Sequence, residues 1–244
     1  MKMKKIAYWF IGCLVGLTAC QWNVRQVEGN GTIIQKEIPI ADYKYVSATG
    51  NNLEIQYTRS DEAPALSVSC DENIWPLVEI RVSNDTLTIE PKPGEILMSP
   101  THFVVQTCSK ELATVNLAGD VDFAVQDSLK SNRLTVNMAG KCLISAQALD
   151  IHHLELNLAG KCETDLHGKA ENVELNLAGK CDYEALSLET GSLKCNTAGS
   201  CSLQVFVNDR IELHPVGICN LSYKGNPQIV QEGVNVGNIK QITE

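Results

Sequence analysis

Apolar and polar residues alternate through a phrase that the chain repeats six times between residues 113 and 219. In its clearest copies, Leu156–Cys162 and Leu175–Cys181, the phrase reads LNLAGKC. Alternation with a period of two is typical of a strand that buries one face. Each copy contains a glycine, and these are Gly119, Gly140, Gly160, Gly179, Gly199 and Gly217. Their spacing of 18 to 21 residues is typical of coils that stack on one another. We therefore predict an all-β, right-handed parallel β-solenoid, or β-helix, with coils of about 20 residues.

The predicted core lies at the positions six, four and two residues before each glycine. These positions are apolar in almost every copy, as with Leu154, Leu156 and Leu158 in the third. Continuing the alternation predicts that the glycine also faces inward, where a missing side chain permits a close backbone approach. A second inward column follows two residues later and consists of Val121, Cys142, Cys162, Cys181, Cys201 and Cys219.

Residues 32–112 alternate less regularly and form the predicted irregular β part of the domain. Alternating runs occupy residues 46–57, 66–70, 78–82 and 86–90, and Ser83-Asn84-Asp85 has the composition of a hairpin turn. Because an open solenoid end exposes unpaired backbone groups, we expect this part to cap or flank the column. Residues 234–238 resemble a degenerate seventh copy. The predicted single β-solenoid domain thus spans residues 32–244, with regular repeats at 113–240.

The first nineteen residues have the pattern of a secretory signal. Lys2, Lys4 and Lys5 precede an apolar run at residues 6–17 that is too short to span a bilayer comfortably. Leu17-Thr18-Ala19-Cys20 then resembles a bacterial lipobox, in which the cysteine is acylated; the alternative is an ordinary signal peptide with an unmodified cysteine. Residues 20–31 are the predicted linker. We expect a lipoprotein held on the outer membrane of the cell envelope by lipid at Cys20, with its periplasmic or external orientation left open.

Composition narrows the classes of partner. The 244 residues are 44% hydrophobic but only 5% aromatic, so the core is built from aliphatic side chains. Without residues 1–19 the chain has 17 basic and 29 acidic residues, a net charge of −12. This charge argues against nucleic acid as a partner.

Together these features resemble the putative auto-transporter adhesin, head GIN domain family, a domain of unknown function in Bacteroidota lipoproteins. The resemblance covers about residues 25–240. Its opening element is matched by residues 27–31, 38–46 and 48–50, and its recurrent Ser-Gly-Ser-Gly turns by Ala-Gly-Lys-Cys at residues 139–142, 159–162 and 178–181. The resemblance implies an adhesive role, but no active site or ligand. Where the family commonly has a second glycine, five coils here carry a cysteine, so a redox or metal role has no family support.

Two polar columns are candidate binding surfaces. The first is Asn116, Asn137, Asn157, Asn176 and Asn196, and the second is Lys141, Lys161 and Lys180. Stacked asparagines can hydrogen-bond to one another as a structural ladder. Alternatively they form a flat polar wall that docks a glycan or another cell-surface polymer, or they turn inward towards backbone carbonyls. The lysines are either a solvated edge that discourages aggregation or a stripe that meets a polyanion.

The inward cysteines have three interpretations: core packing, which we favour, disulfides between coils, and a soft-metal site. A straight column does not offer the tetrahedron of ligands that zinc requires, so we assign no metal and no cofactor. Glu163 and Asp182 occupy equivalent positions on neighbouring coils, as a glycosidase pair would, but no aromatic sugar platform or basic partner accompanies them. We therefore expect a protein that is not an enzyme.

The resulting interpretation is a cell-envelope lipoprotein that presents a rigid β-solenoid surface as an adhesin or glycan-contacting module. A structural periplasmic lipoprotein without a ligand is the alternative, and a carbohydrate-active enzyme is the third possibility. Residues 21–24 lack the acidic cluster associated with surface export in such bacteria, which leaves the orientation open. The oligomeric state is likewise open.

Overall fold

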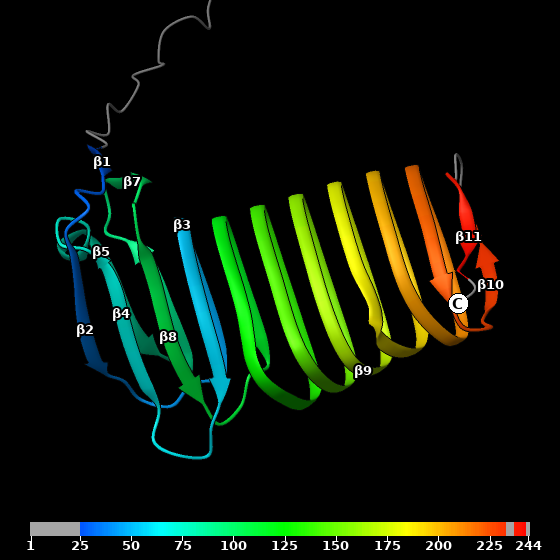
Figure 1. The fold of residues 1–244 in the computed structure, drawn as a ribbon, viewed down its shortest axis with the longest axis horizontal. Coiled ribbons are helices and arrows are strands. Elements are labelled where there is room, and N and C mark those ends of the chain that lie inside the picture. Colours follow the sequence, from blue (N-terminus) through cyan, green and yellow to red (C-terminus); the bar gives the residue numbers. More distant parts are fainter. Residues whose placement is uncertain (1–24, 233–236, 243–244) are drawn as a thin grey trace, which may run out of the picture.

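The computed structural model describes residues 25–232 and 237–242, which are all-β apart from one short 3-10 helix at Trp75–Leu77 (Figure 1). The predicted all-β class is therefore confirmed, whereas the signal segment and Cys20 lie outside the described residues. The strands are β1 (Arg25–Glu28), β2 (Ile33–Pro39), β3 (Tyr45–Arg59), β4 (Ala65–Asp71), β5 (Val78–Ser83), β6 (Thr86–Pro91), β7 (Glu95–Ser99), β8 (Phe103–Ser109), β9 (Thr114–Lys224), β10 (Gln228–Gln231) and β11 (Ile239–Gln241).

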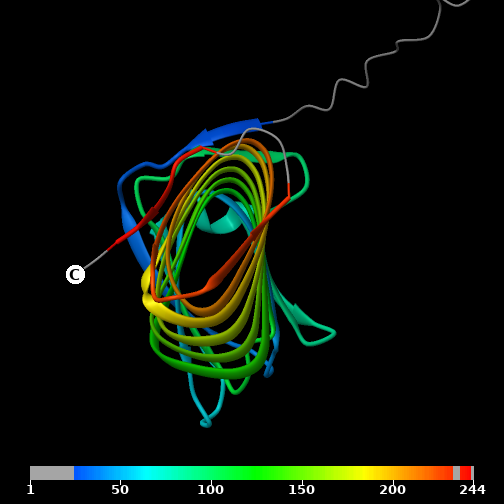
Figure 2. The same cartoon turned by 90° about the vertical axis from the view of Figure 1, so that its right-hand side faces the viewer.

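Strand β9 runs for 111 residues and winds through successive turns, which are seen from the side in Figure 1 and along the column in Figure 2. Each turn places its glycine against the glycine of the turn before. A Cβ atom built on Gly140 would lie 2.4 Å from the carbonyl oxygen of Gly119, and one on Gly160 would lie 2.4 Å from that of Gly140. The repeated phrase therefore recurs at the same place in each turn.

The interior of the wound strand contains the side chains that the alternation predicts. All of the positions six, four and two residues before the glycines are buried except Ala113, which is half-buried. The column that begins at Val121 and continues through five cysteines is also buried. Aliphatic residues from successive turns thus form one hydrophobic cluster that continues into the amino-terminal part.

The glycines do not face inward as predicted. Gly160 is exposed, as are Ala159 and Lys161 beside it, whereas Leu158 and Cys162 are buried. The reason is the corner of the turn: Gly160 has a φ of +112°, which interrupts the pleat of the strand and leaves three consecutive residues outside. The alternation resumes in the same phase after the corner, so the predicted burial of the cysteine column is nevertheless confirmed.

The amino-terminal part continues the sheet of the column. The strand order is β10-β9-β3-β8-β4-β2, and β3 pairs in parallel with both β9 and β8. Gly50 of β3 lies opposite Gly119 of β9, so β3 begins the glycine column. Strands β4 and β2 then add in antiparallel fashion, with β2 at the edge. This arrangement matches the expectation that the irregular part caps or flanks the column.

The predicted hairpin turn is confirmed. Strands β5 and β6 pair antiparallel with Ser83 opposite Thr86. The two residues between them, Asn84 and Asp85, have φ values of 50° and 56°. A two-residue turn with positive φ at both positions suits the twist of a β-hairpin, and Asn and Asp tolerate that conformation better than most residues.

The buried carboxylate of Asp71 joins the segments around Gly31 and Thr101 by hydrogen bonds. Asp71 accepts hydrogen bonds from the backbone N–H groups of Gly31 (2.7 Å) and Thr101 (2.8 Å). Burial opposes ionisation here, but hydrogen bonds from Thr101, Gly31 and His102 outweigh it and lower the pKa of Asp71. Close by, β1 pairs in parallel with β7, although its residues 25–28 fall within the segment predicted as a linker.

Candidate functional site

The five asparagines form a hydrogen-bonded ladder along the outside of β9. Each Nδ2 donates to the Oδ1 of the asparagine one turn earlier, at 2.7 Å from Asn137 to Asn116 and 2.8 Å from Asn157 to Asn137. The Asn176 and Asn196 amides continue the ladder at 2.8 Å each. All five side chains are half-buried and flanked by fully buried neighbours, which places them on the outer face.

The ladder uses only part of the hydrogen-bonding capacity of the amides. A side-chain amide has two N–H donors and an oxygen that accepts two hydrogen bonds. One N–H and one acceptor position of each interior asparagine serve the ladder, so Asn137 and Asn176 keep one of each for another partner. Asn157 also donates to Glu155 Oε1 at 3.2 Å and keeps only an acceptor position. The ladder therefore both stabilises the stack of turns and offers unused amide hydrogen-bonding groups along its length.

A shallow trough runs beside this ladder. It consists of one hollow of about 180 Å³ from Ser47 to Asn157 and another of about 380 Å³ from Asn157 to Ala198. Its floor contains a column of small methyl side chains at Ala118, Ala139, Ala159, Ala178 and Ala198. Amides beside exposed methyl groups can contact an elongated ligand that has polar edges and an apolar face.

The lysine stripe is exposed but partly neutralised. Lys141 forms a 2.9 Å ion pair with Asp120, and this hydrogen bond raises the pKa of Lys141. Lys161 lies 3.4 Å from Glu163. Lys180 has no ion pair within the part of the chain that the structure describes. The three lysines are therefore all exposed, but they do not act as three free cations.

All eight cysteines of the described segments are free thiols. In the inward column, Cys142 donates to the carbonyl of Gly119 at 3.8 Å and Cys162 to that of Ala159 at 3.6 Å. Burial raises the pKa of Cys142 and of Cys219, which favours the neutral thiol. Within residues 25–232 and 237–242, no group of three or more His, Cys, Asp or Glu side chains is arranged to hold a metal ion. These geometries suit core packing.

The carboxylate pair considered for glycoside hydrolysis lies on the surface. Glu163 is exposed and paired with Lys161, and Asp182 is half-buried. A glycosidase general acid typically lies in an apolar pocket, whereas Glu163 is open to solvent beside Lys161.

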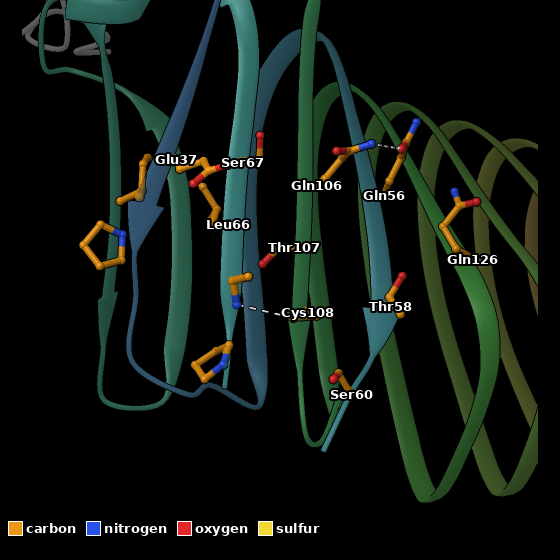
Figure 3. A pocket seen from close by; sticks show the side chains of 14 residues that line it. Glu37, Gln56, Thr58, Ser60, Leu66, Ser67, Gln106, Thr107, Cys108 and Gln126 are labelled. Carbon is orange, nitrogen blue, oxygen red and sulfur yellow. Dashed lines mark hydrogen bonds between the residues drawn. The ribbon is translucent and has the colours of Figure 1, made fainter. Parts of the chain in front are cut away.

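One groove of the described surface was not predicted from the sequence. It is a groove of about 920 Å³ near the amino-terminal end, lined by residues of β2, β4, β8, β3 and β9 (Figure 3). Its residues come from the irregular part, where no repeat indicates which side chains meet. Only the outward polar positions of the individual strands, such as Gln56 and Gln106, were visible in the sequence.

Comparison with protein families decides where the chain belongs. Residues 42–227 match the family model described as putative auto-transporter adhesin, head GIN domain. The chain is a member of this family. The resemblance inferred from the glycine-centred phrases is therefore confirmed, including its extent over most of the chain.

Solved structures of other bacterial proteins share the fold of this family member. A putative lipid binding protein from Parabacteroides distasonis is 26% identical, with a TM-score of 0.74, over 90% of this chain and 100% of the other. A putative adhesin from Bacteroides fragilis is 20% identical, with a TM-score of 0.80, over 88% and 100%. A putative adhesin from Parabacteroides merdae is 24% identical, with a TM-score of 0.65, over 89% and 99%. The comparison with curated proteins finds no match.

The described residues contain no helix with the length and apolar character needed to cross a membrane.

Proposed function

We propose that the chain is a cell-envelope lipoprotein whose stacked strand presents a rigid surface for adhesion, most directly to a glycan. Membership of the adhesin family supports a role at the cell envelope. The lipobox-like Leu17–Cys20 supports attachment to the outer membrane through acylated Cys20. In this proposal the protein binds a ligand and carries out no catalysis.

The rigid surface in this proposal is a right-handed parallel β-solenoid formed by β9. Parallel pairing on both sides supports it, because β3 joins the first turn and β10 and β11 join the last turns in parallel register. The glycine contacts and asparagine bonds between residues about one repeat apart support it as well. A stack of this kind changes shape little on binding, so little ordering entropy is lost when a ligand binds.

One observation carries the proposed contact surface: a continuous ladder of amides runs beside a floor of alanine methyl groups. Each turn repeats an amide and a methyl group at a spacing of about 4.8 Å. A polymer with repeated hydroxyl groups could therefore make equivalent contacts at several turns, and many weak contacts add up. The Lys141, Lys161 and Lys180 edge would add attraction to an anionic polymer, which high salt should weaken.

The adhesion test compares two double variants of the full chain on cells. Asn157→Ala with Asn176→Ala removes amides from the middle of the ladder. Asn132→Ala with Asn208→Ala removes two exposed asparagines that lie off the ladder. We expect at least a fivefold loss of attachment to glycan-coated surfaces for the first pair only, at temperatures where both variants remain folded. Equal attachment by both would contradict the ladder as the contact surface.

Attachment of the protein to the membrane and its orientation there are tested by two separate experiments. Cys20→Ser should release the protein from the membrane fraction if the cysteine is acylated. Protease treatment of intact cells should then remove the anchored wild-type protein if it faces outward. Survival of the protein would favour the structural periplasmic lipoprotein instead.

Lipid binding is a second candidate function, because the 26% identical Parabacteroides distasonis protein is described as lipid binding. Binding of a fluorescent fatty acid by the purified chain would favour this function. The absence of catalysis is tested by incubation of the chain with cell-surface polysaccharides, from which we expect no new reducing ends.

A further inference from the structure

The groove of about 920 Å³ lies on the outer side of five neighbouring strands at the amino-terminal end (Figure 3). This volume is in the range of pockets that hold small molecules. The groove is separate from the asparagine trough, since no residue lines both. Nothing in the family assignment gives it a role.

A row of polar side chains crosses the groove from strand to strand. Glu37 of β2 lies opposite Ser67 of β4, Ser67 opposite Gln106 of β8, and Gln106 opposite Gln56 of β3. We call these four residues the polar row. Because neighbouring strands lie about 4.8 Å apart, the polar row spans about 14 Å across the strands.

The polar row keeps unused hydrogen-bonding groups. Gln106 Nε2 donates to Gln56 Oε1 at 2.9 Å, and Gln56 Nε2 donates to Glu54 Oε1 at 2.6 Å. Within the described residues, Gln106 Oε1 has no protein donor and the Glu37 carboxylate has no ion pair. Figure 3 shows the two glutamines side by side at the groove. The row can therefore both donate to and accept from a ligand.

A second row runs parallel to the first, two residues along each strand. Pro39 lies opposite Ala65, the Ala65 N–H contacts Cys108 Sγ at 3.3 Å, and Cys108 lies opposite Thr58. We call these four residues the small row. It presents small and mostly apolar surfaces about 7 Å from the polar row, since two residues of a strand span that distance. The groove is thus polar along one side and apolar along the other.

Charge and polarity argue against two kinds of ligand in this groove. Glu37 is the one charged side chain among the fourteen lining residues, so an anionic ligand would meet repulsion and no cation. An acyl chain would cover Glu37, Gln56 and Gln106 without offering hydrogen bonds, and desolvation of unpaired polar groups is costly. A sugar has hydroxyl groups at its edges and C–H groups on its faces, so it can satisfy both rows.

We propose that this groove binds a short neutral oligosaccharide lying across the strands, with hydroxyl groups on the polar row and ring faces on the small row. The site is additional to the asparagine ladder and does not require it. A failure of the proposed adhesion and a failure of this site are therefore separate results.

The thiol of Cys108 can report whether a ligand occupies the groove. It lines the groove and is half-buried, whereas the other seven cysteines of the described segments are at most 3% exposed. The experiment measures the maleimide labelling rate of Cys108 by peptide mass spectrometry, on the full chain in isolated membranes. The probes are cellotriose, maltotriose and mannotriose, with trigalacturonate and laurate as anionic and acyl comparisons. We expect at least one neutral trisaccharide to slow labelling fivefold or more, in a saturable manner.

Variants of Gln56 and Gln106 test whether this protection depends on the polar row. Gln56→Ala with Gln106→Ala should abolish protection, and Gln106→Glu, which keeps the size of the side chain, should reduce it at least threefold. Gln147→Ala is the matched control, since Gln147 is an exposed glutamine of β9 outside the groove. It should leave protection unchanged. Protection by laurate or trigalacturonate alone, no protection by any neutral trisaccharide, or equal protection in the glutamine variants would each overturn the proposal.

Discussion

At the scale of single residues, Gly160 shows why the corner of each turn requires glycine. Its φ of +112° disfavours any side chain, and a Cβ atom would lie 2.4 Å from the carbonyl oxygen of Gly140. We predict that Gly160→Ala lowers the free energy of unfolding by about 3 kcal/mol or more, measured by chemical denaturation. Gly31→Ala separates the two causes, because Gly31 has a φ of +75° but no atom within 4 Å of the place that a Cβ would take. It should cost only about 1 to 2 kcal/mol, and equal costs would contradict the role of the close contact.

The second prediction at this scale concerns the buried carboxylate of Asp71. Hydrogen bonds hold its pKa below the ordinary value of 3.8. A lowered pKa contributes stability above the unfolded-state pKa, and this contribution is lost as pH falls through the folded-state pKa. We predict that Asp71→Asn costs about 2 to 4 kcal/mol at pH 7. The cost should shrink below about pH 3.8, where the wild type loses its own contribution. Denaturation of both proteins at pH 7 and at pH 2.5 checks this, and an unchanged difference would refute it.

At the scale of elements, the asparagine ladder ties neighbouring turns of β9 together. Asn176 bonds to both Asn157 and Asn196, whereas Asn196 stands at the end of the ladder and bonds to Asn176 alone. Each net hydrogen bond is worth about 1 kcal/mol. We predict that Asn176→Ala lowers the free energy of unfolding by about 2 kcal/mol and Asn196→Ala by about half as much. Thermal unfolding monitored by circular dichroism measures both, and an equal or reversed order would count against ladder stabilisation.

The same elements explain which features the sequence could predict. Apolar residues recur with the strand period at the positions of Leu156 and Leu158, so the burial of these residues could be predicted from the alternation alone. The outward position of Gly160 could not be predicted, because the buried residues before and after the corner continue the same alternation of inward and outward positions. The groove was hidden for another reason. Glu37, Ser67 and Gln106 meet only through the antiparallel pairing of β2, β4 and β8, which no local pattern specifies.

At the scale of the whole molecule, the wound strand has mostly local partners. Each turn of β9 contacts the turn before and the turn after, as the contacts of Gly160 with Gly140 and of Gly179 with Gly160 illustrate. A stack with only nearest-neighbour contacts gains stability approximately turn by turn. Loss of one complete turn should therefore remove one interface and allow the remaining columns to meet in register.

We predict that excision of residues 161–179, which joins Gly160 directly to Lys180, leaves a cooperatively folded protein. The deletion joins equivalent corner positions, so the leucine, asparagine and cysteine columns on either side remain aligned. The longest dimension in small-angle X-ray scattering should decrease by about 4.8 Å, the spacing of one strand. Excision of residues 161–170 is the control, since it ends partway round a turn and brings outward positions onto the core. If the complete-turn deletion unfolds as readily as this partial deletion, the turns of β9 do not behave as equivalent stacked units, and the solenoid proposal is wrong.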